Sequence, residues 1–569
     1  MKEPSQNAEI TTPVLIVGGG VVGLSAALFL LHQGIVPLLV EKHDQPSIQP
    51  RGRGFDIRTM ELFREIKISK QIREAGKALG PSFGILKDSS LANALKDVKP
   101  GKKKSPEKVL GVEKLAKLSP EPVTRCTQDL SEPILLREAI SRGADVRFGT
   151  ELVAFEQDDK QVKAIIKDRK TGDERFVIAD YLIACDGSKS PIRKKLQATT
   201  SGPGEIADLL NIYFEADLKD FVKGREFSQL IIDEPDLKGF MPAINNSDRW
   251  IFHMKFDPEK KETFSEERLI QILRKVIGLP DLPIRIISTA AWCPTARVVD
   301  NMNYNRIFLA GDAAHTMTPY GGKGANTGVQ DVHNLAWKLA MVIHGTASLN
   351  LLNTYTAERQ PVGYFNTIQS GNWTDENGLL DKKKAFNIVT ILSNSIAFKL
   401  AHLFNLKKLA QRIGIDKFAG MIGIPDYAYT STAIAGSEAG LNKFQKAKSL
   451  TGDPGTRFPH FWIRREKQEL STLDLLGKRF ILFTGRYRDR WNFLIEKINT
   501  QLNTEIVIHS FDTDLKLTHP KGSLHTELGI TESGAVLVRP DGFVAWRAEN
   551  DNANSLAEFE IQVPKLLSR

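Results

Sequence analysis

Three glycines and one acid near the N-terminus have the spacing of a phosphate-binding turn. Gly18, Gly20 and Gly23 follow the apolar run 14–17 and begin a second apolar stretch, an order typical of strand, tight turn and helix. In GxGxxG the first glycine turns the chain, the second lets the backbone approach a pyrophosphate, and the third lets helix and strand pack closely. The phosphate would lie at the helix N-terminus. A second apolar run ends at Glu41, whose carboxylate suits a ribose diol, so the sequence predicts a dinucleotide-binding βαβ unit.

A pair of arginines follows this unit. Arg51 and Arg53 are each followed by a glycine, soon after the second predicted strand. Guanidinium groups in such a loop suit an anionic ligand, because arginine donates parallel hydrogen bonds to a single anion. The alternative is a basic turn whose side chains face water. The residues alone leave both interpretations open.

Two further acids stand at the ends of predicted strands. Asp186 follows the apolar strand 181–185, and Asp312 follows the strand 307–310. An acid at the carboxyl end of a strand suits a polyol chain. The glycine-rich segment 319–328 then begins a helix, whose first N–H groups can face developing negative charge.

Three side chains that could move protons have plainer interpretations. His315 fits packing or loop anchoring better than acid–base work, because no paired carboxylate accompanies it in the sequence. Tyr213 and His253 lie on predicted strands, where such side chains usually pack. We therefore identify no catalytic base from the sequence.

The elements between these motifs follow helix and strand patterns in turn. A helix is expected from Cys126 to Arg142, and strands of a meander at 145–148, 151–157 and 161–167. The region from about 196 to 296 is rich in alternating strands, such as 210–216 and 249–256, and carries no phosphate loop. We interpret it as an inserted, substrate-facing sheet.

Composition bounds the remaining possibilities. The chain has 569 residues, of which 41% are hydrophobic and 25% charged, so wholesale disorder and collagen-like structure are excluded. The net charge of +9 selects no partner, and aromatic content of 8% without basic–aromatic interleaving gives nucleic-acid binding little support. Three cysteines with no close pair predict neither a metal site nor a redox dithiol, and favour a reducing, cytoplasmic location. The glycines of the first motif argue against a membrane span, and the lysine-rich stretch 96–117 suggests a mobile surface loop.

Taken in order, the glycine motif with Glu41, the Asp186-Gly187 strand end and the Gly311-Asp312 strand end closely resemble the single-component FAD-dependent aromatic hydroxylases, or group A flavoprotein monooxygenases. The resemblance covers about residues 10–375. It implies that the ADP moiety is bound by Gly18, Gly20, Val22, Gly23 and Glu41, and Lys42 is included among the cofactor-binding residues. Arg51 and Gln128 would lie near the pyrophosphate and ribityl chain, Asp186 would serve FAD and NADPH, and Asp312 would hold ribityl hydroxyls. Gly324, Ala325 and Asn326 would offer backbone donors to the flavin pyrimidine.

The C-terminal part carries a second, narrower resemblance. Asp453 to Pro459, Leu473 to Leu475, Arg479 to Phe483 and Val538 to Arg547 resemble the thioredoxin-like domain of the phenol and polyketide hydroxylase branches. No cysteine follows Cys293, so dithiol exchange is excluded there. The expected fold is therefore α/β: a Rossmann-like FAD-binding domain (10–195 and 297–375), an inserted mixed β-sheet substrate domain (196–296), a helical connection (376–450) and a thioredoxin-like domain (451–569).

This resemblance implies a monooxygenase that consumes NADPH or NADH and hydroxylates a bulky aromatic substrate with O₂ through a flavin C(4a)-hydroperoxide. The Pro319 carbonyl could orient substrate, and the Lys323 cation could stabilise reduced flavin. A phenolic, polyketide or antibiotic-like substrate is favoured by the C-terminal branch. A related FAD epoxidase or Baeyer-Villiger-type oxygenase, or a flavin-binding protein without turnover, remains an alternative. We expect a monomer or homodimer.

Overall fold

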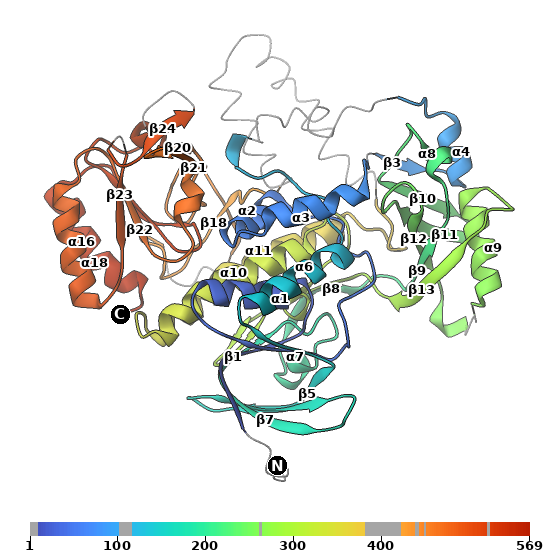
Figure 1. Cartoon of the computed structure of the whole chain (residues 1–569), viewed down its shortest axis with the longest axis horizontal. Helices are drawn as coiled ribbons and strands as arrows, with labels where there is room; N and C mark the ends of the chain where they lie inside the picture. The colour runs from blue at the N-terminus through green and yellow to red at the C-terminus, as the bar shows by residue number, and fades with distance from the viewer. Residues whose placement is uncertain are drawn as a thin grey trace.

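A computed structural model gives the arrangement of the chain (Figure 1). It describes residues 9–82, 84–101, 117–260, 264–381, 423–437, 443–448, 451–511, 513–519 and 524–569. Within these ranges no helix is both long and apolar enough to cross a bilayer. The centre of the lysine-rich stretch, 102–116, and most of the expected helical connection, 382–422, lie outside the described residues.

A mostly parallel sheet forms the base of the molecule. Its strand order is β15-β16-β7-β1-β2-β4, with β5 and β6 continuing from β7. The strands are β1 Ile10–Val17, β2 Leu38–Glu41, β4 Asp145–Phe148, β5 Thr150–Gln157, β6 Val162–Asp168, β7 Glu174–Ala184, β15 Asn303–Tyr304 and β16 Ile307–Leu309. Central strands β1, β2, β7 and β16 pair in parallel, as the predicted βαβ unit requires.

Three long helices pack on this sheet: α1 Val21–His32, α6 Gln128–Ser141 and α10 Gly324–Ile343. Helix α11 (Thr354–Asn372) packs against α10, and α2 (Ile57–Glu65) and α3 (Ser69–Gly76) complete this layer. The residues of α1 from Gly23 to Leu30 are all buried, because α1 lies between α6, α10 and the sheet. Such a helix is apolar on all sides.

The predicted meander is wrong in one strand. Strand β4 pairs in parallel with β2, with Leu38 beside Asp145 and Glu41 beside Phe148. Only β5, β6 and β7 form the antiparallel meander. The alternation of apolar and polar residues within 145–148 predicts a strand but not its partner, because long-range packing decides which strands become neighbours.

A second sheet of six strands stands beside the first domain (green in Figure 1). Its order is β13-β9-β12-β11-β10-β3, formed by β3 Ile85–Lys87, β9 Leu209–Glu215, β10 Gln229–Glu234, β11 Leu237–Pro242, β12 Arg249–Lys255 and β13 Arg285–Trp292. Side chains of one face, such as Phe214 and Trp250, form a core with α9 (Glu266–Ile277) and α4 (Leu91–Lys96). Strand β3 and helix α4 precede residue 196, so this unit also draws on the N-terminal part of the chain.

A short third sheet connects the two units. Strand β14 (Thr295–Val299) pairs with β8 (Thr200–Glu205) and with β17 (His315–Thr316). The connections at residues 200–205 and 295–299 therefore run through one small sheet, whereas β3 and α4 reach the six-stranded unit separately.

The C-terminal unit, red in Figure 1, is built on a four-stranded sheet of order β23-β22-β25-β26. Strands β22 (Ile481–Thr484) and β23 (Val507–Ser510) are parallel, while β25 (Ala535–Val538) and β26 (Val544–Ala548) are antiparallel, as a thioredoxin-like core would have them. Helices α16 (Asp489–Leu502) and α18 (Ala553–Leu566) cover it, and β20 (Trp462–Arg465), β21 (Gln468–Ser471) and β24 (Lys516–His519) form a second sheet.

The described part of the expected helical connection is not helical. Strand β18 (Tyr427–Ala428) pairs with β19 (Gln445–Lys446). Tyr427 and Tyr429 pack with Phe543 of the C-terminal unit. For these residues the helical prediction is wrong, because the segment is held by contacts with other domains.

Candidate functional site

The glycine turn has the geometry that its spacing predicts. Gly18 adopts φ +112°, and a Cβ there would collide with the Cys185 carbonyl. A Cβ on Gly23 would collide with the Gly18 carbonyl, so α1 can start only where this position has no side chain. Gly20 is the N-cap of α1 and leaves its first N–H groups directed out of the turn.

Glu41 lies directly beside this turn at the end of β2. Its carboxylate accepts hydrogen bonds from Gly19 N at 2.6 Å and His43 N at 2.9 Å. The side chain is 13% exposed, so part of the carboxylate faces outward. Lys42 is exposed, and its carbonyl accepts a hydrogen bond from Arg169 at 2.8 Å.

Arg51 and Gln128 are brought together although 77 residues separate them. Gln128 N donates to the Arg51 carbonyl at 2.8 Å. The Gln128 side chain donates to Glu132 at 2.6 Å, and Glu132 also accepts from Ser47 N at 3.0 Å. Sequence reasoning missed Glu132, which is 1% exposed; its position one turn after Gln128 was the available signal. Burial raises the pKa of Glu132.

The two later acids also converge on this region. Asp186 is fixed through one oxygen, which accepts from Ile192 N at 3.2 Å, while its buried Oδ1 has no hydrogen-bond partner among the described residues. Asp312 points its Oδ1 toward the start of α10, 4.0 Å from the Cβ position of Gly324. Burial raises the pKa of both carboxyl groups. Asp186 is a half-buried residue and Asp312 an exposed one, so both carboxylates can be reached by a ligand that donates hydroxyl hydrogen bonds.

Arg193 holds these two strand ends together. Its guanidinium donates to the Ser188 carbonyl at 2.6 Å and to the Ala313 carbonyl at 3.0 Å. The two loops that follow Asp186 and Asp312 are therefore connected by one buried side chain. This residue positions the acids without belonging to the predicted set.

Asn326 anchors the start of α10 to residues 49–56, the loop that carries Arg51 and Arg53 and is called the arginine loop below. Its side chain donates to Gly322 O at 2.7 Å and accepts from Asp56 N at 2.9 Å. The backbone N–H groups of the first turn, at Gly324, Ala325 and Asn326, remain the donors of the helix N-terminus. Val22 packs against Gly311 and Gly328, where any Cβ would clash with it, so α1 and α10 cross closely.

The two predicted catalytic residues lie just before this helix. The Pro319 carbonyl accepts from Gly322 N at 3.3 Å, which closes a turn. Lys323 is the N-cap of α10, and its charge lowers the otherwise raised pKa of Asp56 and of Asp426. The lysine therefore already interacts with carboxylates of the protein.

His315 has the anchoring role that its neighbours suggest. It is fully buried, and Nε2 lies 2.6 Å from Asp331, which also accepts from Arg359 at 2.8 Å. Ion pairing with His315 and Arg359 lowers the pKa of Asp331 despite its burial. This cluster joins β17, α10 and α11 rather than facing a cavity.

The inner face of the six-stranded sheet, opposite its apolar core, is polar and aromatic. Asn211, His253 and Phe240 are cross-strand neighbours on β9, β12 and β11. His253 stacks on Phe240 at 4.4 Å and accepts a hydrogen bond from Trp292 Nε1 at 3.1 Å. Asn211 donates to Gln49 of the arginine loop at 3.1 Å, which places this face against the loop.

Sequence reasoning assigned His253 to packing, and the stacking of its ring on Phe240 agrees with this interpretation. Its Nε2 makes no hydrogen bond within the described part of the chain. Tyr213 also has a structural role, accepting from Arg249 at 2.9 Å. Strand alternation separates the two faces of the sheet, because Ile212, Phe252 and Met254 face the core while Asn211 and His253 face away from it.

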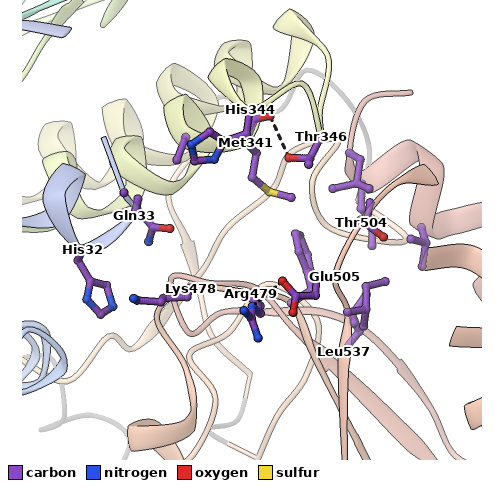
Figure 2. A pocket seen from close by; sticks show the side chains of 17 residues that line it. His32, Gln33, Met341, His344, Thr346, Lys478, Arg479, Thr504, Glu505 and Leu537 are labelled. Carbon is purple, nitrogen blue, oxygen red and sulfur yellow. Dashed lines mark hydrogen bonds and ion pairs between the residues drawn. The ribbon is translucent and has the colours of Figure 1, made fainter. Parts of the chain in front are cut away.

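A separate cavity of about 370 Å³ lies between the first domain and the C-terminal unit (Figure 2). His32 and Gln33 at the end of α1, Met341 near the end of α10, and Lys478 line it with apolar residues of α18. None of the predicted site residues is among its lining residues. It belongs to the domain junction and not to the candidate site.

The comparisons with known proteins agree with this geometry. A family described as "FAD binding domain" matches residues 11–368, and one described as "Aromatic-ring hydroxylase, C-terminal" matches residues 451–563. The tetracenomycin A2 monooxygenase-dioxygenase of Streptomyces glaucescens is 37% identical, over 98% of this chain and 97% of its own. The 4-methyl-5-nitrocatechol 5-monooxygenase of a Burkholderia species is 34% identical over 95% of both chains.

Solved structures show the same fold. The ternary complex of aklavinone-11 hydroxylase with FAD and aklavinone aligns with a TM-score of 0.80 and 27% identity, covering 99% of this chain and 100% of that one. The flavin-dependent monooxygenase PieE, in complex with FAD and substrate, aligns with a TM-score of 0.78 over 98% and 99% of the two chains. The chain belongs to the FAD-dependent aromatic-ring hydroxylases, and it is a flavoprotein monooxygenase that uses FAD.

Proposed function

We propose that this enzyme hydroxylates a polycyclic phenolic substrate of the polyketide or antibiotic type, bound between the first domain and the inner face of the six-stranded sheet. The observation that carries the proposal is the convergence of the glycine turn, Asp186 and Asp312 with an aromatic and polar sheet face. Relatives named for tetracenomycin and aklavinone support a polycyclic substrate.

The residues present fit FAD. The glycine turn provides close backbone approach for the pyrophosphate, and the unpartnered Oδ1 of Asp186 is an acceptor awaiting a donor. In our assignment the ADP portion is bound by Gly18, Gly20, Val22, Gly23, Glu41 and Lys42. The central chain is bound by Arg51, Gln128, Asp186 and Asp312. The pyrimidine end is bound by Gly324, Ala325 and Asn326. FAD, once bound, supplies the electron-transfer and oxygen chemistry, with O₂ and NADPH or NADH as cosubstrates.

The chain's own contribution is orientation, charge and exclusion of water. The first backbone N–H groups of α10, at Gly324, Ala325 and Asn326, point out of the helix N-terminus. They stabilise negative charge on a group bound in front of them. Lys323 would add a cation, shared with Asp56 and Asp426, and the Pro319 carbonyl would face the reacting ring. The rings of Tyr320 and Phe240, whose centroids lie 6.0 Å apart, form the apolar side of the proposed substrate site and limit the access of water to it.

The direct test is turnover. Purified holoenzyme is mixed with NADPH in air, with and without a panel of polycyclic phenols, while NADPH consumption and products are followed by absorbance and mass spectrometry. We expect one class of phenol to accelerate NADPH consumption and to gain one oxygen atom, labelled when ¹⁸O₂ is used. Stimulated consumption without an oxygenated product in every case would contradict the proposal. Location in the cytoplasm and a monomeric or homodimeric state are part of it; size-exclusion chromatography with light scattering tests the latter.

A further inference from the structure

Asp331 is a fully buried acid of α10, and it fixes residues 311–315, called the Asp312 loop below. Its Oδ2 accepts a hydrogen bond from Gly311 N at 3.2 Å, at the start of the loop, where the backbone adopts φ +57°. The same oxygen lies 2.6 Å from His315 Nε2, at the end of the loop. One carboxylate therefore holds the two ends of the loop that presents Asp312.

Arg359 of α11 is the residue that orients this carboxylate. Its Nε donates to Asp331 Oδ1 at 2.8 Å, and its Nη2 donates to the Thr327 carbonyl at 3.1 Å. Thr327 belongs to the first turn of α10, which begins at Gly324. The Arg359 side chain is 0% exposed, and its planar fork sets the angle between these partners. A single guanidinium therefore connects two parts of the proposed cofactor site, the Asp312 loop and the start of α10.

The third nitrogen of Arg359 binds a segment outside the first domain. Nη1 donates to the hydroxyl oxygens of Tyr429 at 2.9 Å and Tyr427 at 3.2 Å, on β18 and next to it. This segment is attached to the C-terminal unit (Figure 1): Tyr429 N donates to the Gly455 carbonyl at 2.8 Å, and the Tyr429 ring stacks on Phe543 with centroids 4.1 Å apart. All three nitrogens of Arg359 are thus hydrogen-bonded, and the partners of Nη1 depend on the C-terminal unit.

The preceding residue of α11 contacts the C-terminal unit directly. Glu358 accepts from Arg539 at 2.6 and 2.8 Å and from the Ser431 hydroxyl at 2.7 Å. Ser431 lies two residues after Tyr429, so Glu358 and Arg359 bind the same short segment. The positions of both side chains therefore depend on contacts that only the folded C-terminal unit provides.

We propose that Arg359 and Asp331 are positioning residues for the cofactor, through which the C-terminal unit holds the Asp312 loop and the start of α10 in the arrangement that binds FAD. This inference rests on the proposed function, in which Asp312 and the first N–H groups of α10 contact FAD. A shift of about 1 Å is enough to remove a hydrogen bond to the cofactor. The C-terminal unit, which has no cysteine for dithiol exchange, thereby takes part in cofactor binding through the first domain.

The test measures FAD binding without turnover. The double variant Tyr427→Phe/Tyr429→Phe keeps both rings and the stacking on Phe543, and it removes only the two hydroxyls that accept from Arg359. We expect the FAD dissociation constant, measured by flavin fluorescence as the holoenzyme is diluted, to rise about 3–10-fold, the size of one ordinary hydrogen bond. Arg359→Lys cannot reach all three sets of partners and should raise the constant roughly tenfold to a hundredfold.

A second readout separates positioning from loss of fold. The midpoint potential of bound flavin depends on the donors around it, because N–H groups at a helix start stabilise the negative charge of the reduced form. Arg359→Lys should make this potential more negative, whereas a variant that only unfolds more easily keeps it unchanged. Tyr181→Phe is the matched control, a buried tyrosine beside Arg306 elsewhere in the first domain, and should change neither the dissociation constant nor the potential.

A double-mutant cycle tests the route through the Asp312 loop. Arg359→Lys should weaken FAD binding less in an Asp312→Ala background than in the wild type, because the contact that it positions is already missing. Fully additive losses would overturn the inference. Unchanged FAD affinity in both Tyr427→Phe/Tyr429→Phe and Arg359→Lys, or an equal loss in Tyr181→Phe, would also overturn it.

Failure of the proposed function gives a different pattern of results. A polycyclic phenol that binds but is never oxygenated contradicts the proposed function and leaves the effects of these variants on FAD binding intact. Normal oxygenation by the wild type, together with one FAD dissociation constant for all the variants of Arg359 and its tyrosine partners, removes only the positioning role.

Discussion

The first domain meets its two neighbours in opposite ways. Toward the C-terminal unit the contact is a buried network of ions: Glu358 accepts from Arg539 at 2.6 and 2.8 Å and from Lys338 at 2.9 Å, and all three side chains are 0% exposed. Asp541 pairs with Arg539 in the same cluster. Each charge there is matched by another charge of the protein.

Toward the six-stranded sheet an ion pair of Asp129 with Arg249 stands beside contacts in which a charge meets only neutral groups. Gln49 donates to Ser288 at 2.5 Å, and Arg53 binds only a backbone carbonyl and a hydroxyl of Ser228. The pKa shifts of two acids follow the same division. Ion pairs lower the pKa of Glu61 at the C-terminal junction, whereas burial raises the pKa of Asp312 at the cofactor site. One junction is electrostatically complete, while the other side of the domain leaves polar groups for ligands.

Removing a charge from the complete junction should have the largest effect. Arg539→Met leaves Glu358 and Asp541 buried with less compensation, and we expect a loss of about 3–5 kcal/mol in the free energy of unfolding. Urea unfolding followed by circular dichroism measures it. Arg490→Met, at a pair with a 65% exposed arginine, should change stability by less than about 1 kcal/mol. Similar losses in the two variants would contradict the comparison.

The ligand-facing side should respond in binding rather than in stability. Asp312→Ala removes an acceptor that we assign to a ribityl hydroxyl, and we expect FAD affinity to fall roughly tenfold to a hundredfold. Titration of the FAD-free protein, followed by flavin fluorescence, gives the dissociation constant. Unfolding of the FAD-free variant should differ little from wild type, because Asp312 is an exposed residue when no cofactor covers it. Unchanged FAD affinity would remove Asp312 from the site.

Acid should weaken the complete junction selectively. Glu61 accepts from Arg457 at 2.9 Å, and its folded pKa lies below the ordinary value of 4.5. The unfolded chain therefore binds more protons, and stability present above about pH 4.5 is lost as pH falls toward the folded pKa, by about 1.4 kcal/mol per unit of displacement. Asp312 has the opposite sign, because its pKa is raised. Unfolding measured from pH 7 to 4 should show a shallower loss in Glu61→Gln; an equally steep loss would refute this assignment.

Packing at the junction cavity should give the smallest effect. Val563 lines the cavity, so Val563→Leu can place its extra carbon in empty space and should raise stability by about 0.5–1 kcal/mol. Val538 is buried in the neighbouring sheet and does not line the cavity. Val538→Leu should destabilise by about 1–3 kcal/mol through overpacking. Thermal unfolding of the two variants compares them, and a shared sign would contradict the cavity's assignment.

Local sequence pattern predicted the parts of the site that lie within one turn. Gly18, Gly20 and Gly23 could be found from their spacing, which defines the turn of a βαβ unit, although the carbonyl that Gly18 approaches belongs to Cys185 after β7. Asp186 and Asp312 could be found because each ends an apolar strand. Their joint attachment to Arg193 could not, since it depends on which strands become neighbours.

The remaining features depend on contacts across long stretches of chain. Glu132, the pairing of β4 with β2, and the approach of Arg53 to the sheet of His253 are set by packing between units, which no local periodicity encodes. The C-terminal junction is the extreme case: Glu358 and Arg539 are 181 residues apart. Each would be interpreted alone as a surface charge, since buried charges are rare.

The cavity of Figure 2 gives the molecule a mechanical consequence. A folded protein occupies more volume than its unfolded chain by an amount that grows with its internal voids, so hydrostatic pressure favours whichever opening eliminates the most empty space. A cavity of about 370 Å³ at the C-terminal junction therefore makes this junction compressible, although it is paired by charge. Compression should loosen the C-terminal unit there.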